Sequence, residues 1–516
     1  MEKKKFVRLV QTGVSVLCIG FLIVASGTAL AAPKGNVALA TYQAQGMTGF
    51  DIHTGSGSHH GTALSLVHAK LIEKDVKGNY GPDLATSWEI GPQWSFVKFY
   101  MNKNAKFHDG KPITAEDVKF TIERAMKSKY LWKSELNRNV KKVEVVDKHT
   151  VIIHMKAAYP AIMDRCSFYY GIVPKHYIDK VGNKTFAEKA IGGGPFKLVR
   201  YKQGVFAEVT ANTDHYRKVP NIKNFRLLHV KEGATRSAML KTGEIDIAQL
   251  DPGTFWEMNN VPGIRVEWAR DCYLSTLSFY DLAFPDTPSP IHDIRVRKAL
   301  ALGVDRKTIC EKVLKGGATP QGDVLAPYNP GFDPSIKPTP YDPEKARALL
   351  KEAGYPNGFE ISMTCIPSSK MEAEAIAAGF SKIGVKVKLN IPETMIWSRM
   401  VRNKKFKGIA RDSGPYWNGR GHPASSMWSY TYSTSVWCFV GTPEVDKRLG
   451  ELAKLSDKKE IAAAAADFSK YYRSILTRSP LWSVHRPHGL RDRIKSFKWP
   501  PGWSAPTHFE YLVLND

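Results

Sequence analysis

The sequence contains few cysteines, and no two of them are separated by just two residues. Of the six cysteines, Cys18 lies in an apolar N-terminal segment and the other five are far apart along the chain. This spacing excludes a zinc ribbon and a thioredoxin-type redox motif. Without Cys18, five cysteines remain, so at least one of them would be left out of any disulfide pairing. We expect the five later cysteines to be buried as small apolar side chains.

Long apolar runs are also missing, except near the N-terminus. Three lysines and Arg8 precede an apolar run from Val14 to Ala25, and Ala29-Leu30-Ala31 follows it. A positive stretch, an apolar stretch and a small-residue exit predict a cleaved secretory signal over residues 1–31. The run is shorter than the roughly 20 residues that span a bilayer, which disfavours an uncleaved membrane anchor. We therefore expect an exported mature chain.

Acidic residues are scarce relative to basic ones. The chain has 74 Lys and Arg against 49 Asp and Glu, a net charge of +25. Removal of the signal segment, with four positive charges and one negative, leaves +22. The basic residues are scattered, so a solvated basic surface is the favoured interpretation and steering of anionic ligands is the alternative. An exported protein does not ordinarily meet nucleic acid, so we expect no nucleic-acid partner.

Catalytic motifs are missing as well. No G-x-S-x-G, H-E-x-x-H or S-x-x-K motif stands in a setting that would support catalysis, so we predict neither an enzyme nor a cofactor.

About 485 mature residues exceed what one hydrophobic core usually serves, which predicts at least two lobes.

Helix and strand signals alternate along the chain. Asp342-Pro343 predicts the start of a helix, and Gly354 predicts its end. Thr114 with Asp117 is typical of a capping box. An apolar stripe from Ile461 to Ile475 predicts a helix closed by Pro480. Strands are predicted between the helices, with Val, Ile, Phe and Tyr alternating with polar residues. The interleaving favours α/β lobes. The strand segments are "WSFVKFYM", "KVEVVDKHTVIIHM", "FKLVRY", "EIDIAQL" and "VKVKLNI".

Six ordered segments together resemble one family. They are "LATSWEI", "FYMNKNAKFHDGKPITAEDVKFTIERAM", "GGGPFKLVRYKQG", "ATRSAMLKTGEIDIA", "IHDIRVRKALALGVDRKTICEKVLKGGATP" and "YDPEKARALLKEAGYPNGFEI". The chain resembles the extracytoplasmic solute-binding proteins of peptide/nickel-type ABC importers, which include oligopeptide- and dipeptide-binding proteins. Each segment also has a local meaning: "FHDG" predicts a turn, and Gly192-Gly193-Gly194-Pro195 predicts a close crossing of backbones.

The resemblance implies a two-lobed periplasmic binding protein of type II with an additional third domain and a ligand cleft between the lobes. Lobe I would comprise residues 32–65, 190–270 and 480–516, the inserted domain II residues 66–189, and lobe III residues 271–479. The lobes would close on a small-molecule ligand by hinge motion and deliver it to permease subunits in the inner membrane. A periplasmic monomer is expected.

The segment from Arg411 to Trp428 is predicted to line the cleft. Its candidate ligand-binding residues are Arg411, Asp412, Tyr416, Trp417, Arg420, His422 and Trp428. Arg411 matches an arginine that oligopeptide binders place near the ligand's carboxylate end. The aspartate that such relatives use for the peptide's amino group has no match, because Trp417 or Gly419 stands there and Arg420 is nearby.

A pocket with arginines and no fixed acid favours an anionic or neutral polar ligand, with aromatic and glycosidic compounds among the candidates. Two alternatives stay open on this point. Asp412 could take the place of the missing acid, so that peptides are bound, or the aromatic residues could pack the lobe's own core. A chaperone-like protein that binds extended chains loosely is a further possibility.

The segment "FDIHTGSGSHHG" is expected to contribute from the opposite lobe. His53 and His59 are candidate ligand contacts, and His53, His59 and His60 are an alternative nickel or metal-chelate site. Tyr273 is expected to reach the ligand from the chain crossing between the lobes.

Overall fold

The structure is a computed structural model, and the predicted signal segment lies outside the residues that it describes. Within those residues, no helix combines the length and the apolar character that crossing a membrane requires. The described residues are 32–42, 49–53, 58–75, 79–127, 133–169, 171–251, 254–413, 421–435, 437–497 and 508–515.

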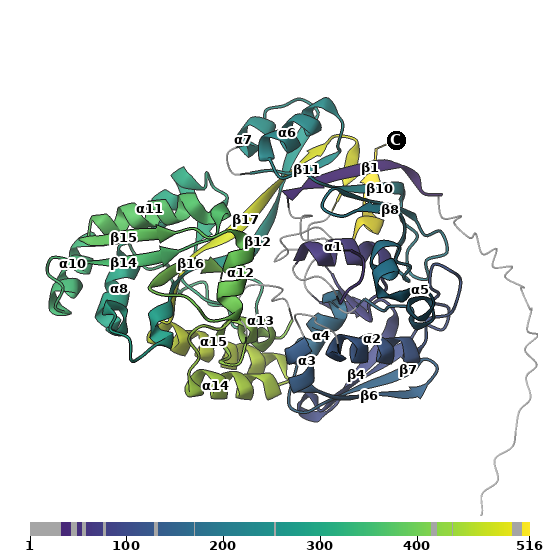
Figure 1. The fold of residues 1–516 in the computed structure, drawn as a ribbon, viewed down its shortest axis with the longest axis horizontal. Coiled ribbons are helices and arrows are strands. Elements are labelled where there is room, and N and C mark those ends of the chain that lie inside the picture. Colours follow the sequence, from purple (N-terminus) through teal and green to yellow (C-terminus); the bar gives the residue numbers. More distant parts are fainter. Residues whose placement is uncertain are drawn as a thin grey trace, which may run out of the picture. The chain divides into compact units, whose positions relative to one another are not determined.

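A sheet of eleven strands runs through the described part of the chain, in the order β15-β14-β16-β12-β17-β11-β1-β10-β9-β8, with β13 beside β17. Figure 1 shows the long antiparallel strands β12 and β17 connecting the β14–β16 side to the β1 and β10 side. The strands are β1 (Lys34–Thr41), β8 (Phe196–Lys202), β9 (Phe206–Ala211), β10 (Ile222–His229), β11 (Ile247–Gln249), β12 (Ile264–Phe279), β13 (Ala318–Pro320), β14 (Phe359–Thr364), β15 (Val385–Asn390), β16 (Ile409–Ser413) and β17 (Arg478–Arg491).

Helices pack at both ends of this sheet, and each end has its own apolar core. One core includes Val37, Phe196 and Phe225, and another includes Leu277, Ile361 and Trp482. At the β1 end lie α1 (Ser58–Val67), α5 (Lys175–Glu188), α6 (Gly233–Thr242) and α7 (Phe255–Met258). At the β14 end lie α8 (Ile294–Leu302), α9 (Arg306–Thr308), α10 (Pro343–Glu352), α11 (Lys370–Ser381), α12 (Thr394–Arg402), α13 (Pro423–Thr431), α14 (Pro443–Lys454) and α15 (Lys458–Ile475).

A separate four-stranded sheet, in the order β4-β5-β7-β6, has a core of its own, formed by residues between Ala69 and Ile172. Its elements are β4 (Ala85–Ile90), β5 (Phe96–Met101), β6 (Val140–Asp147), β7 (Thr150–Met155), α2 (Ala115–Lys127), α3 (Lys133–Asn139) and α4 (Ala161–Asp164). The exact boundaries of the three domains stay a prediction.

The remaining elements are short. Two small pairs of strands are β2 (Ile72–Lys74) with β3 (Tyr80–Pro82), and β18 (Ile494–Ser496) with β19 (Val513–Leu514). The short helical turns are η2 (Pro92–Trp94), η3 (Arg165–Tyr169), η4 (Tyr280–Ala283), η5 (Pro290–His292), η6 (Ile309–Val313), η7 (Pro367–Ser369) and η8 (Phe509–Tyr511).

The predicted helix starts are confirmed. Asp342 caps α10 by accepting from the Lys345 backbone N–H at 2.9 Å. Asp117 accepts from the backbone N–H of Thr114 at 2.9 Å, which is the reciprocal half of a capping box. The prediction for Pro480 is wrong, because α15 ends at Ile475 and Pro480 lies inside β17. Leu476, in the left-handed backbone region with φ 48°, ends that helix instead.

The two glycine motifs contact each other. The backbone N–H of His108 donates to Gly192 O at 2.7 Å, and the His108 ring lies 3.0 Å from Gly194 O. A Cβ on Gly192 would lie 2.1 Å from Val67 O, which confirms the predicted close crossing of backbones. Gly110 has φ 85°, as the predicted turn requires.

The five cysteines after the signal segment are buried, as predicted, and all five are free thiols, which the sequence left open.

Candidate functional site

An irregularity in the β12–β17 pair places Tyr273. Ala269 pairs with Arg486 and Tyr273 pairs with Val484, so β12 carries extra residues between these two positions. Asp271, within this bulge, has a positive φ of 53°. Bulges redirect side chains, and here the bulge lies where the chain passes from one end of the sheet to the other.

Arg486 lies between two tyrosine rings beside this bulge. Its guanidinium carbon is 5.7 Å from the ring centre of Tyr42, the residue after β1, and 5.5 Å from that of Tyr273. Nη1 donates to the Tyr42 hydroxyl at 2.7 Å. Its Nε is buried and, among the described residues, has no hydrogen-bond partner. The guanidinium therefore has donors to spare for a further acceptor.

Arg411, on β16, approaches Tyr273 with its guanidinium carbon 6.0 Å from the ring centre. Its Nε donates to Glu372 Oε2 at 2.8 Å, and Nη2 contacts the same oxygen. The Trp482 indole also donates to this oxygen, at 3.0 Å. Burial alone would lower the pKa of Arg411, but Glu372 raises it above its ordinary value. The prediction that no fixed acid accompanies Arg411 is wrong, because Glu372, 39 residues away, neutralises it.

Asp412 belongs to a different group of side chains, because successive residues of a strand point to opposite faces of the sheet. Its carboxylate accepts from the Tyr280 hydroxyl at 2.6 Å and from Arg478 Nη1 at 3.2 Å. All three residues are buried. Asp412 is therefore held in a structural ion pair, which disfavours the alternative that it binds the amino group of a peptide.

His422 and Trp428 are engaged in packing. His422 Nδ1 accepts from the Ala424 backbone N–H at 3.2 Å at the start of α13, and Nε2 lies 3.2 Å from Leu455 O. Because both ring nitrogens are used within the protein, the predicted ligand contact of His422 is disfavoured. Trp428 stacks on Tyr432 with ring centres 3.8 Å apart, against an apolar cluster.

Three of the predicted residues, Tyr416, Trp417 and Arg420, lie outside the described residues, and their roles stay predictions. The same holds for the side chains of His59 and His60. His53 contacts the guanidinium of Arg124, which forms a double hydrogen bond with Asp51 at 2.7 and 2.5 Å. A cation against the imidazole disfavours the alternative metal site at His53.

The sequence interpretation did not find Arg486, Tyr42, Glu372 or Trp482. Arg486 and Tyr42 are 444 positions apart, and nothing in the local pattern around either residue predicts that they meet.

Comparison with known proteins agrees with this architecture. The model of "Bacterial extracellular solute-binding proteins, family 5 Middle" matches residues 79–437, which is more than half of the chain. The chain therefore belongs to the family 5 extracellular solute-binding proteins. It is thus a substrate-binding component of an ABC importer.

Two curated proteins and one solved structure are similar to this chain. Heme-binding protein A of Haemophilus influenzae is 27% identical over 79% of this chain and 79% of its own length. The nickel-binding periplasmic protein of Escherichia coli is 25% identical over 82% of this chain and 84% of its own. Among solved structures, AgaA from A. tumefaciens R10 in complex with agropinic acid has a TM-score of 0.77 at 23% identity, covering 91% of this chain and 96% of that one.

Proposed function

We propose that this protein is exported to the periplasm through a cleaved signal segment, binds a small solute that carries a carboxylate, and delivers it as a monomer to the permease of an ABC importer. Arg486 would hold the carboxylate, with Tyr42 and Tyr273 on either side and Arg411 close by. Binding, and not catalysis, would be its task.

The observation that carries the proposal is the lack of an acid beside Arg486 among the described residues. The buried arginines in this part of the chain are compensated either by an acid or by main-chain carbonyls, whereas Arg486 is half-buried without an acid partner among the described residues. Arg411 and Arg478 pair with Glu372 and Asp412, and Arg306 donates to four carbonyl oxygens. The guanidinium of Arg486 contacts the Tyr42 hydroxyl and the two rings. A half-buried guanidinium whose Nε is shielded from water is stabilised by an anion, which the ligand would supply.

The surroundings of Arg486 suit such a ligand. A guanidinium binds a carboxylate through two parallel N–H donors, and the Nε of Arg486 is one of those still unused within the described residues. The rings of Tyr42 and Tyr273 would provide flat walls for apolar or sugar faces. Because Tyr42 follows β1 while Tyr273 and Arg486 belong to β12 and β17, hinge motion would change their spacing.

A dipeptide ligand is the second candidate, because a dipeptide-binding protein of Pseudomonas aeruginosa is 27% identical over 66% of this chain and 69% of its own length. The ammonium group of a dipeptide is held most strongly by a free acid. The two acids described next to the predicted loop, Glu372 and Asp412, are each held by an arginine. Two structural relatives were solved with ligands named as acids, agropinic acid and mannopinic acid, which supports the first candidate.

Calorimetric titration tests the proposal. Untagged mature protein is unfolded and refolded to remove any retained ligand, and is then titrated with carboxylic acids, their methyl esters and dipeptides. We expect binding of acids and not of esters. Loss of a charged hydrogen bond is worth about 1.5–3 kcal/mol, so Arg486→Met should weaken binding about 10- to 100-fold.

Arg295→Met is the matched control. Arg295 pairs with Asp293 on the surface of the β14 end, and its removal should leave affinity unchanged. Tight dipeptide binding that Arg486→Met does not weaken would overturn the carboxylate proposal and favour the peptide candidate.

A further inference from the structure

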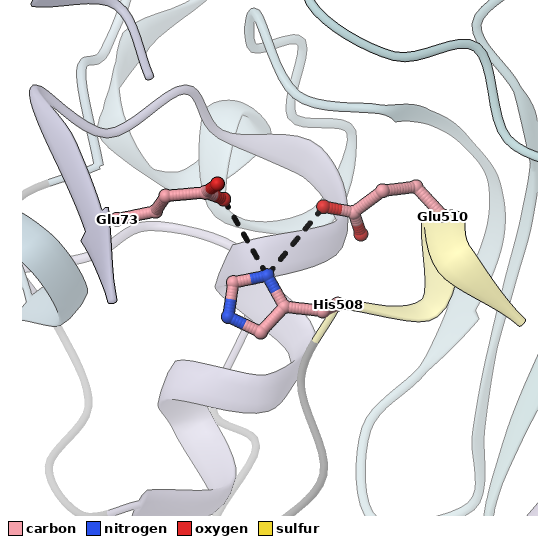
Figure 2. A group of neighbouring side chains, drawn as sticks. All are labelled: Glu73, His508 and Glu510. Atoms are coloured by element: carbon pink, nitrogen blue, oxygen red, sulfur yellow. Dashed lines mark ion pairs between the residues drawn. The ribbon is translucent and has the colours of Figure 1, made fainter. Parts of the chain in front are cut away.

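Three potential metal ligands meet at the C-terminal end of the chain. Glu73 is on β2, and His508 and Glu510 are at η8, more than 430 positions later in the sequence. Figure 2 shows both carboxylates directed at the same ring nitrogen of His508. One ligand atom of each residue lies within 4.8 Å of the other two. Among the described residues, these three side chains are the His, Cys, Asp and Glu group whose ligand atoms lie close enough together to surround one metal ion.

The separations suit a bound ion better than direct hydrogen bonds. His508 Nδ1 lies 3.5 Å from Glu73 Oε2 and 3.6 Å from Glu510 Oε1. Strong hydrogen bonds from nitrogen to oxygen are about 2.7–3.2 Å long. Ligands at about 2.1 Å from a tetrahedral zinc ion are about 3.4 Å from one another. Small side-chain adjustments would therefore place all three atoms around one ion.

The cluster carries an excess of negative charge. Glu73, Asp83 and Glu510 surround Arg217, at 2.8, 3.4 and 2.8 Å from its nitrogens. Three carboxylates and one guanidinium leave a net charge of about −2 when the imidazole is neutral. A divalent ion would neutralise the group.

Arg217 is compatible with such an ion. A carboxylate oxygen has two lone pairs, and a guanidinium that takes one of them leaves the other for a metal. Carboxylates that bind metals are commonly held by such outer hydrogen bonds. Glu73 Oε2 is wholly buried, and despite its nearness to Arg217 it has no hydrogen bond of acceptable geometry within the described residues. This oxygen is an acceptor that those residues do not satisfy.

We propose that Glu73 Oε2, His508 Nδ1 and Glu510 Oε1 form a three-ligand site for a divalent first-row transition ion, with zinc the best fit to one imidazole and two carboxylates, and water in the fourth position. The ion would fasten residues 508–515 to β2. The site shares no residue with the proposed solute site around Arg486.

Zinc titration of the apoprotein tests this site. Untagged mature protein is treated with a chelator and titrated with Zn²⁺ by calorimetry, and thermal unfolding is recorded with and without the ion. We expect one zinc per chain and a higher Tm when zinc is bound. His508→Ala should weaken zinc binding at least about a hundredfold, since even outer-shell changes cost 10- to 100-fold. Glu73→Gln, which preserves side-chain volume, provides the same test if His508→Ala does not fold.

Two control variants distinguish this site from zinc binding at histidines elsewhere on the protein. His176→Ala removes a part-exposed imidazole that pairs with Asp109 at 2.7 Å, and it should keep full zinc affinity. The double variant His59→Ala/His60→Ala tests the alternative metal site predicted near the N-terminus, and it keeps the zinc affinity if zinc binds at Glu73, His508 and Glu510. Saturable zinc binding that is lost in that double variant but retained in His508→Ala and Glu73→Gln would overturn the proposal, as would the absence of saturable binding to the wild type. Carboxylate binding by Glu73→Gln should equal that of the wild type, so the two proposals can fail separately.

Discussion

The indole N–H of Trp94 donates to the backbone oxygen of Leu455 at 3.0 Å. Trp94 belongs to η2, beside the four-stranded sheet, and Leu455 follows α14 at the β14 end of the large sheet. His422 bonds the same oxygen, and its ring meets Trp94 edge to face. Ser425 also donates to Asp164 of α4. These contacts connect the two regions at positions away from the β12–β17 crossing.

We predict that Trp94→Phe speeds release of the bound solute. The variant loses one hydrogen bond of about 1 kcal/mol between regions that a hinge opening would separate, so the dissociation rate should rise roughly fivefold. Stopped-flow fluorescence measures this rate. Trp88→Phe, on β4, is the control and should leave the rate unchanged. Equal rates for Trp94→Phe and the wild type would show that these contacts persist when the solute leaves.

We predict that Glu372→Gln destabilises the fold by about 3–5 kcal/mol. The substitution leaves the buried Arg411 without its counter-charge. Denaturant unfolding measures the loss. The double variant Glu372→Gln/Arg411→Met should be less destabilised than the sum of the two single variants, since it removes both charges. Glu360→Gln, at an exposed position of β14, should change stability little. Additive losses would contradict a coupled pair.

Stability should fall as the pH decreases from about 6.5 towards 4. Burial lowers the pKa of His422 to about 4 and that of His488 to about 3, whereas the unfolded chain titrates histidine near 6.5. In this window the unfolded state binds more protons, so each histidine lowers stability by up to about 1.4 kcal/mol per pH unit. His422→Gln should make the slope shallower below pH 6.5 and leave it unchanged above pH 7.5. An identical slope below pH 6.5 would contradict a neutral buried His422.

Gly192→Ala should destabilise the protein by about 1–3 kcal/mol. The added Cβ would lie 2.1 Å from Val67 O, which forces the backbone to shift. Gly450→Ala is the matched control, because Gly450 lies within α14 and a Cβ there meets no atom of the described residues within 4 Å. That control should stabilise the protein by about 0.5–1 kcal/mol. Thermal unfolding of both variants measures the difference, and equal Tm values would contradict the close packing at Gly192.

Local sequence determined much of the secondary structure of this protein. Asp342 and the pair Thr114 and Asp117 start their helices through contacts within three residues, so these helix starts could be read from the sequence alone. The six family segments likewise led to the class of protein. The local sequence does not predict the position of Pro480, because its place in β17 depends on pairing with Thr276, more than 200 residues earlier.

Only the tertiary structure decided which charged side chains of the candidate site are paired with an opposite charge. Arg411 and Arg486 are both arginines within strands, and the sequence around them does not indicate their partners. Arg411 contacts Glu372, whereas Arg486 contacts Tyr42 and Tyr273. The difference arises because Glu372 reaches Arg411 from helix α11, whereas Tyr42 and Tyr273 reach Arg486 from the end of β1 and from the bulged strand β12. The electrostatic energy of a buried charge depends on distances of a few ångströms, and the order of residues along one chain does not specify those distances.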